Sequence, residues 1–230
     1  MRRNVLKNID FMLGIIKRPP LGIVLAATIF ACLFLGFFVD KEIIVFIKEN
    51  PQYFYIDVFK IITKVGDATG WLLAASIGFL FCVFVQRSQY LLQYHSQLYD
   101  YALKFWYVIL SCLLSGVIHH AIKITLGRYR PRYLFLEQWY GINPLNFNIA
   151  HNSFPSGHTQ TIFAITAALT ILYPRLGIVF FSIAVLVGIS RIILIAHYPS
   201  DVIFGAYLGL STAILVRRYY LDKRLIIKLH

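Results

Sequence analysis

Six apolar segments recur along the chain, separated by short polar connections. A helix rises about 1.5 Å per residue, so about 20 apolar residues span the roughly 30 Å hydrocarbon core of a bilayer. Of the 230 residues, 59% are hydrophobic and only 14% are charged, which excludes an ordinary soluble domain. We therefore expect an all-α membrane protein, a bundle of six transmembrane helices with spans at residues 21–39, 68–85, 105–127, 155–173, 176–196 and 202–216.

The segment between the first two spans, residues 41–64, mixes charged residues with apolar and aromatic ones. Such a composition predicts a helical segment that lies at the outer membrane interface. No internal repeat or low-complexity stretch divides the chain. We expect one membrane-embedded domain over residues 1–230, with the chemistry in residues 123–201.

Lysine and arginine are distributed unevenly between the two predicted faces of the membrane. With six crossings, 13 of the 22 Lys and Arg residues lie on the side of the termini and the other nine on the opposite side. The positive-inside rule then places both termini in the cytoplasm and the opposite face outside it. Together with the small size of the chain, this predicts a multi-pass protein of the bacterial inner membrane with its site facing the periplasm. The net charge of +12 flanks apolar spans, so anionic lipid is the expected partner and nucleic acid is not.

Three ordered clusters of polar residues interrupt this apolar background. In chain order they are Lys123 with Arg130-Pro131, then Pro155-Ser156-Gly157-His158, then Ser190-Arg191 with His197 and Asp201. The 39 residues from His158 to His197 suffice for two crossings of the membrane. All three clusters are therefore expected to emerge on the same outer face.

The first two clusters contain the groups that bind a phosphate. Lys123 and Arg130 are seven residues apart, about two helical turns, and the Arg130-Pro131 pair is expected to end that helix. Pro155 suits the first turn of the next helix, which would leave the backbone amides of Ser156, Gly157 and His158 free to bind an anion. Arginine adds bidentate contacts to phosphate oxygens.

The third cluster supplies the reactive groups. Asp201 is the only acidic residue within ten residues of either histidine of the clusters, His158 or His197. A histidine nucleophile needs one ring nitrogen held by a carboxylate, which favours His197 as the nucleophile and leaves His158 for proton transfer. Three cations match the charge on the equatorial oxygens of a phosphoryl group in transfer.

The combined pattern K-x6-RP, PSGH and SR-x5-H-x3-D resembles the type 2 phosphatidic acid phosphatase superfamily, in its integral membrane lipid phosphatase branch. The resemblance covers about a third of the chain. It implies that His197 attacks phosphorus to form a phosphohistidine, that Asp201 orients its ring, and that His158 protonates the leaving oxygen and then activates water. It also implies phosphate binding without any cofactor or metal by six residues: Lys123, Arg130, Ser156, Gly157, Ser190 and Arg191.

The expected function is hydrolysis of a lipid phosphate monoester or diphosphate. Candidate substrates are polyprenyl diphosphate, lipid A phosphate, phosphatidylglycerophosphate and phosphatidic acid, and no motif selects among them. A phosphotransferase that passes the same phosphoryl group to a lipid acceptor is an alternative, because the clusters do not distinguish water from another acceptor. A transporter that only binds anionic lipid is the non-enzymatic alternative, and it leaves His197 and Asp201 unexplained. The loop after Pro131 is expected to contact a headgroup or solvent, and the same holds for Arg128.

Overall fold

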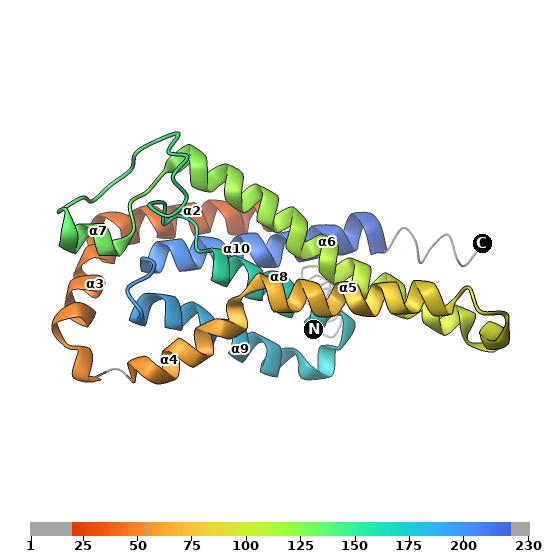
Figure 1. Cartoon of the computed structure of the whole chain (residues 1–230). Coiled ribbons are helices and arrows are strands. Elements are labelled where there is room, and N and C mark those ends of the chain that lie inside the picture. Colours follow the sequence, from red (N-terminus) through yellow and green to blue (C-terminus); the bar gives the residue numbers. More distant parts are fainter. Residues whose placement is uncertain (1–19, 54, 222–230) are drawn as a thin grey trace, which may run out of the picture.

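The computed structural model describes residues 20–53 and 55–221, and within these residues every regular element is helical (Figure 1). This confirms the predicted all-α class. The α-helices in chain order are α2 (Leu21–Phe38), α3 (Asp40–Glu49), α4 (Ile56–Ile62), α5 (Ala68–Val85), α6 (His95–Leu126), α7 (Pro131–Leu136), α8 (Gly157–Leu172), α9 (Gly177–Ile193) and α10 (Pro199–Val216).

Five stretches of the described chain are long and apolar enough to cross a membrane: Leu21–Phe38, Ile56–Val85, Tyr90–Leu126, Pro174–Ile193 and Pro199–Tyr220. The remaining predicted span corresponds to α8, which has only 16 residues. Helix α8 lies inside the bundle and contacts α6, α9 and α10, and its residues 159–168 are all buried. Protein surrounds α8, whereas α2 contains no buried residue and exposes its apolar side chains.

Three predicted helix boundaries differ from the structure. Helix α6 starts at His95, ten residues before the predicted span at 105, and ends at Leu126 with Gly127 in a left-handed conformation (φ 59°) as its C-cap. Arg130 therefore lies beyond the helix, in extended backbone ahead of α7, and the Arg130-Pro131 pair begins a new helix. Helix α8 begins at Gly157, so Pro155 precedes its N-cap instead of occupying its first turn.

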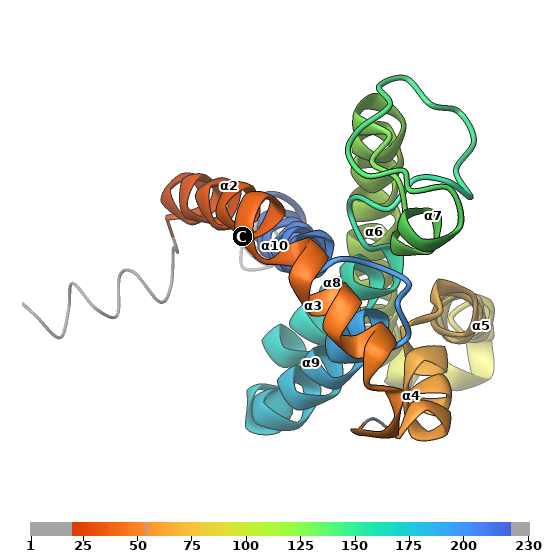
Figure 2. The ribbon, with the colours of Figure 1, turned by 90° about the vertical axis from the view of Figure 1, so that its left-hand side faces the viewer.

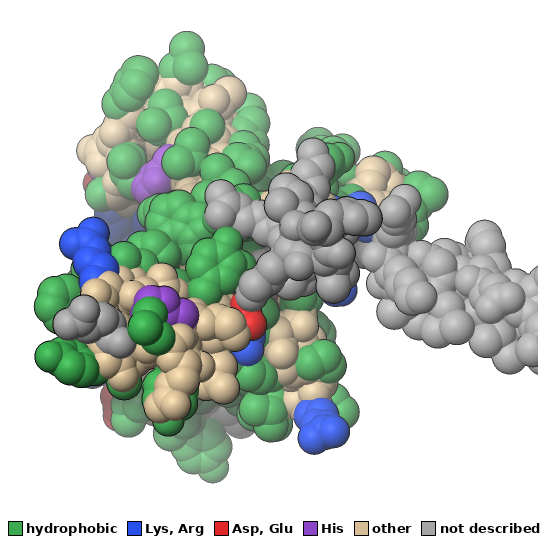
Figure 3. Space-filling view, turned by 90° about the vertical axis from the view of Figure 1, so that its right-hand side faces the viewer, with side chains coloured by type: hydrophobic (Ala, Val, Ile, Leu, Met, Phe, Trp, Pro, Cys, Tyr) green, Lys and Arg blue, Asp and Glu red, His purple; other side chains and the backbone are tan. Residues whose placement is uncertain are grey.

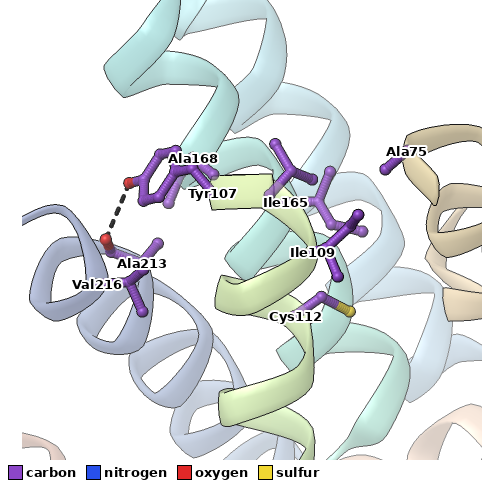
Figure 4. Close-up of a cluster of buried hydrophobic side chains, with 10 residues drawn as sticks. Ala75, Tyr107, Ile109, Cys112, Ile165, Ala168, Ala213 and Val216 are labelled. Carbon is purple, nitrogen blue, oxygen red and sulfur yellow. Dashed lines mark hydrogen bonds between the residues drawn. The ribbon is translucent and has the colours of Figure 1, made fainter. Parts of the chain in front are cut away.

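The largest hydrophobic core joins α5, α6, α8 and α10 (Figure 4). Tyr107 of α6 is fully buried in this core, and its hydroxyl donates a hydrogen bond to the Ala213 carbonyl of α10 over 2.9 Å. Ile165 and Ala168 of α8 pack beside it. A polar hydroxyl in this apolar surrounding is tolerable because its hydrogen bond is satisfied.

Two glycines allow α10 to approach α8 closely. A Cβ at Gly205 would lie 2.7 Å from the Ser156 carbonyl oxygen, and one at Gly209 would collide with the backbone of α8 at Gln160 and Ala164. Small residues at four-residue spacing serve this purpose in membrane helices. This close approach brings the first turn of α10 against the start of α8.

The two ends of the bundle differ in structure. Figure 2 views the end that carries α3 and α7, and α3 runs across this end from α2 toward α4. Figure 3 views the opposite end, where Lys and Arg side chains appear at several separate places among hydrophobic ones. The predicted segment 41–64 is thus mainly helical, with α3 and α4 in it.

Candidate active site

The three polar clusters meet at the end of the bundle that carries α3 and α7. Lys123 lies in the last turn of α6, Arg191 in the last turn of α9, and His158 in the first turn of α8. His197 lies in the connection before α10. Electrostatic interactions link Lys123, Arg130 and Arg191 with His158, so residues far apart in sequence share one site.

Asp201, in the first turn of α10, is fully buried and uses both carboxylate oxygens. Its Oδ2 accepts hydrogen bonds from the Ser153 hydroxyl (2.5 Å) and the Tyr198 backbone N–H (2.9 Å). The Nδ1 atom of His197 lies 3.6 Å from the same oxygen and 3.3 Å from the Ser153 hydroxyl. The Ser153 hydroxyl thus lies beside the imidazole and the carboxylate and contacts both.

This arrangement selects the protonation state of the His197 ring. An ionised carboxylate only accepts hydrogen bonds, so the single hydroxyl proton of Ser153 is donated to Asp201. Nδ1 of His197, which faces the Ser153 oxygen, must then carry the ring proton. We assign the Nδ1–H tautomer on this basis, which leaves a lone pair on Nε2 for attack on an electrophile.

Burial also keeps the His197 ring neutral. The side chain is almost fully buried, and burial lowers the pKa of His197 to about 3 although the charge of Asp201 opposes this shift. A neutral imidazole at physiological pH is the form that acts as a nucleophile.

Lys123, Arg130 and Arg191 each form few hydrogen bonds within the described protein. Arg130 donates through Nε to the Asn152 carbonyl (3.1 Å), Arg191 donates to the Thr63 hydroxyl (2.6 Å), and Lys123 lies 3.4 Å from the Pro155 carbonyl. None of the three forms an ion pair with a carboxylate of residues 20–53 or 55–221. Each arginine keeps further N–H donors for an anion, because a guanidinium has five.

The start of α8 differs in part from the prediction. The Ser156 N–H donates to the Asp201 carbonyl (3.0 Å), and the Ser156 hydroxyl contacts that of Thr159 (2.9 Å). The Ser156 amide is thus engaged, contrary to the expectation that it is free, whereas Gly157 and His158 occupy the first turn, where backbone N–H groups lack helical acceptors. The Ser190 hydroxyl donates to the Val187 carbonyl of its own helix (2.6 Å).

Sequence reasoning missed Arg128 and Ser153, which bind Asp201, and Asp40, which binds Arg128. The Arg128 side chain was expected to contact a headgroup or solvent, but it is buried and donates to Asp201 Oδ1 (2.8 Å) and Asp40 Oδ2 (2.8 Å). Ser153 had no sequence signal beyond its position two residues before Pro155. Asp40 follows the first apolar span directly, and a buried acid at such a place is identifiable only from its partner.

Comparison with known families and proteins agrees with this site. The family model of the PAP2 superfamily matches residues 104–225, more than half of the chain. The match includes all three polar clusters, from Lys123 to Asp201.

Individual relatives each match about half of the chain. A lipid A 1-phosphatase from Rhizobium johnstonii is 37% identical over 116 residues, which are 49% of this chain and 48% of that protein. The bacitracin transport permease protein BcrC from Bacillus licheniformis is 30% identical over 109 residues, 47% of this chain and 54% of the relative. The chain thus spans about half the length of these curated relatives.

One solved structure shares the fold over most of its length. The crystal structure of a transmembrane PAP2 type phosphatidylglycerolphosphate phosphatase from Bacillus subtilis superposes with a TM-score of 0.55 and 24% identity. The superposition covers 86% of this chain and 96% of the other.

Proposed function

The chain belongs to the PAP2 superfamily, and from this premise we propose that it is a membrane phosphatase that removes phosphate from a lipid through a phosphohistidine. The Nε2 lone pair of His197 attacks phosphorus, and the bond from phosphorus to the lipid oxygen breaks. His158 donates a proton to that oxygen as it leaves. Water then attacks the phosphohistidine, His158 accepts a proton from the water, and the P–N bond breaks to regenerate neutral His197.

The uncompensated positive charge of the site is the observation that carries this proposal. Lys123 is buried and Arg130 and Arg191 are half-buried, yet these cations have no carboxylate partner among the described residues. Desolvated cations are costly unless an anion compensates them. A phosphoryl group supplies that negative charge, and its equatorial oxygens gain charge stabilisation in the transition state.

The remaining predicted phosphate ligands complete the proposed site. We assign Gly157 and Ser156 to the phosphoryl oxygens through the start of α8, with Ser190 beside Arg191. Because the Ser156 amide already binds the Asp201 carbonyl, its contribution to phosphate binding comes from its hydroxyl. Asp201 acts on His197 and binds no phosphate, since a carboxylate would repel it.

A cavity beside His158 has the character expected for the lipid portion of the substrate. It has a volume of about 630 Å³ and is lined by residues of α5, α6 and α8, among them His158, His119 and Gly116. Val117, one of its lining residues, is 69% exposed, so the cavity reaches the surface of the bundle. In this proposal the phosphate occupies the cationic end and the hydrocarbon lies along α5 and α6.

The proposed setting is a single domain in a bacterial inner membrane. In this setting α8 is the sixth crossing and both termini are cytoplasmic. The end of the bundle with α3 and α7 faces the periplasm, and α3 lies at the outer membrane interface. The distribution of Lys and Arg supports this orientation, with 13 of 22 on the side of the termini. Cysteine accessibility labelling at Glu137, on the loop after α7, tests it in intact cells with Glu137→Cys.

Lipid A phosphate is the first substrate to test. The Rhizobium johnstonii relative, which is 37% identical over 116 residues, carries the name lipid A 1-phosphatase. That match covers only 49% of this chain, so the other lipid classes belong in the same panel: phosphatidylglycerophosphate, phosphatidic acid and polyprenyl diphosphate.

The decisive experiment incubates the purified full chain with ³²P-labelled members of this panel and follows free phosphate, labelled lipid and labelled protein separately. We expect free phosphate and a transient acid-labile label on the protein. His197→Ala should abolish both, with Arg175→Ala as a control, because Arg175 is exposed and follows the end of α8 opposite to His158. Transfer of label only to another lipid would establish a phosphotransferase instead, and full turnover by His197→Ala would disprove the mechanism.

A further inference from the structure

A buried ion network joins Asp201, the carboxylate beside the proposed nucleophile, to Arg128 and Asp40. The guanidinium of Arg128 donates through Nη1 to Asp201 Oδ1 and through Nη2 to Asp40 Oδ2, each at 2.8 Å. Both carboxylates are fully buried and Arg128 is nearly so. We propose that Arg128 and Asp40 are positioning residues of the active site, which hold the Asp201 carboxylate in the orientation that His197 requires. The inference rests on the proposed function of His197 as nucleophile.

The two oxygens of Asp201 have separate partners. Oδ1 binds Arg128, whereas Oδ2 binds Ser153 and faces His197. A carboxylate held at both oxygens cannot rotate about its last bond, so Oδ2 stays directed at the imidazole. Without Arg128, the buried Oδ1 would have no partner, and the carboxylate would turn to satisfy it.

Arg128 also holds the residue that joins Asp201 to His197. Its backbone carbonyl accepts a hydrogen bond from the Ser153 N–H over 2.6 Å. Arg128 thus positions Oδ1 of Asp201 through its side chain. Through its backbone it positions Ser153, which binds Oδ2. The guanidinium lies 4.2 Å from the centre of the Tyr198 ring, which confines it further.

Asp40 adjusts the charge of the network. If Arg128 paired with Asp201 alone, the two charges would cancel, and little negative charge would remain for His197. Asp40 shares the guanidinium, and its own position is held by the Ser200 N–H at 3.0 Å and by the Ser200 hydroxyl. Two carboxylates against one guanidinium leave a net charge of about −1, which stabilises the cationic ring that forms when Nε2 bonds to phosphorus.

The surroundings of the network strengthen these interactions. Arg128 and Ser200 line one end of an apolar crevice of about 800 Å³ between α2, α6 and α10. Electrostatic interactions are stronger and unpaired charges costlier in such a low-dielectric environment. The pairs with Asp40 and Asp201 therefore confine Arg128 to one place.

The test compares Arg128→Lys with the matched control Arg175→Lys in the full chain. Arg175 is an exposed arginine in the short 3-10 helix Pro174–Leu176, which connects α8 and α9 at the end of α8 opposite to His158. A lysine at position 128 keeps the charge but cannot bind two carboxylates in the fixed geometry of a guanidinium. We expect kcat to fall about 10- to 100-fold, as for outer partners of other active-site ligands, with KM for the lipid changed less than about twofold. The control should keep both values.

A double-mutant cycle separates positioning from a structural role. If Arg128 acts through Asp201, then Arg128→Lys combined with Asp201→Asn should be no slower than Asp201→Asn alone. Losses that multiply would overturn the proposal. If Arg128→Lys does not fold, Asp40→Asn provides the same comparison, because asparagine keeps an acceptor for Arg128 and removes only the charge. We expect kcat of Asp40→Asn to fall about tenfold.

The tautomer of His197 provides a readout independent of turnover. ¹⁵N NMR of histidine-labelled protein should show Nδ1–H for His197 in the wild type and a mixture of tautomers in Arg128→Lys. If the wild type releases phosphate from no lipid, the proposed function is contradicted. The NMR comparison of the His197 tautomer still tests the positioning role, because it does not depend on turnover. A folded Arg128→Lys or Asp40→Asn protein with the wild-type tautomer and the wild-type kcat would overturn the positioning role.

Discussion

The backbone N–H of Ser156 donates a hydrogen bond to the backbone carbonyl of Asp201 over 3.0 Å. This bond joins the N-cap of α8 to the first turn of α10, and so it joins the two segments that carry His158 and His197. The relative position of the two histidines is thereby set by the main chain. Side-chain substitutions at the site are therefore expected to change chemistry more than they change the fold.

His158→Ala should slow the second step of the reaction more than the first when the leaving group needs no proton. With an aryl phosphate, the leaving oxygen is already a good leaving group, so phosphorylation of His197 loses little. Hydrolysis of the phosphohistidine still needs a base for water and should slow by about 10²- to 10⁴-fold. Trapping with an alkaline quench, in which the P–N bond is stable, should then show accumulation of labelled protein, and equal losses in both steps would contradict the assigned role.

Ser153→Ala should lower kcat about tenfold and leave KM nearly unchanged. The substitution removes the hydroxyl that contacts both His197 Nδ1 and Asp201 Oδ2, while the cations proposed to bind phosphate keep their positions. Steady-state kinetics on the best lipid of the panel measure this split. Ser211→Ala is the matched control, because Ser211 is also buried but its hydroxyl binds only the Leu208 carbonyl of its own helix. A rise in KM alone would show that Ser153 acts on substrate binding.

His197 should make the folded state less stable in acid. Burial lowers its pKa to about 3, below the ordinary value of 6.5, so between these values the unfolded state binds more protons than the folded state. Stability is therefore lost as the pH falls from about 6.5 toward 3, by about 2 kcal/mol between pH 7 and pH 5. Guanidinium unfolding in detergent at the two pH values, compared with His197→Asn, measures the difference. Equal pH dependence of both proteins would disagree with a neutral buried His197.

Gly209→Ala should destabilise the bundle by about 1–3 kcal/mol, because the added methyl group would overlap the backbone of α8 at Gln160 and Ala164. Gly70→Ala is the control, since a Cβ there has no neighbour within 4 Å. Thermal unfolding in detergent should show a lower midpoint for Gly209→Ala only. An unchanged midpoint would indicate that α10 can move away from α8 at little cost.

The helix prediction succeeds where an apolar run and a local end signal coincide. Helix α5 has the predicted bounds, Ala68–Val85, because Asp67 caps it by accepting a hydrogen bond from the Thr69 N–H (2.7 Å). It fails at the start of α6, where residues 95–104 are helical but too polar to appear as part of a span. Hydropathy detects the apolar part of a helix that lies in the membrane interior. It does not detect a polar part of the same helix that continues outside the membrane.

Composition, the length of the apolar runs and the order of the three clusters were enough to predict an all-helical membrane protein and to name the residues of the candidate site. Those features are local, and each acts through a few neighbouring residues. The Arg128 network required the tertiary structure, since Asp40, Arg128 and Asp201 come from three distant segments whose meeting depends on how α2, α6 and α10 pack. From the sequence alone a charged residue is expected to be exposed to solvent. Its burial becomes evident only when its buried partner is known, and no local pattern in the sequence identifies that partner.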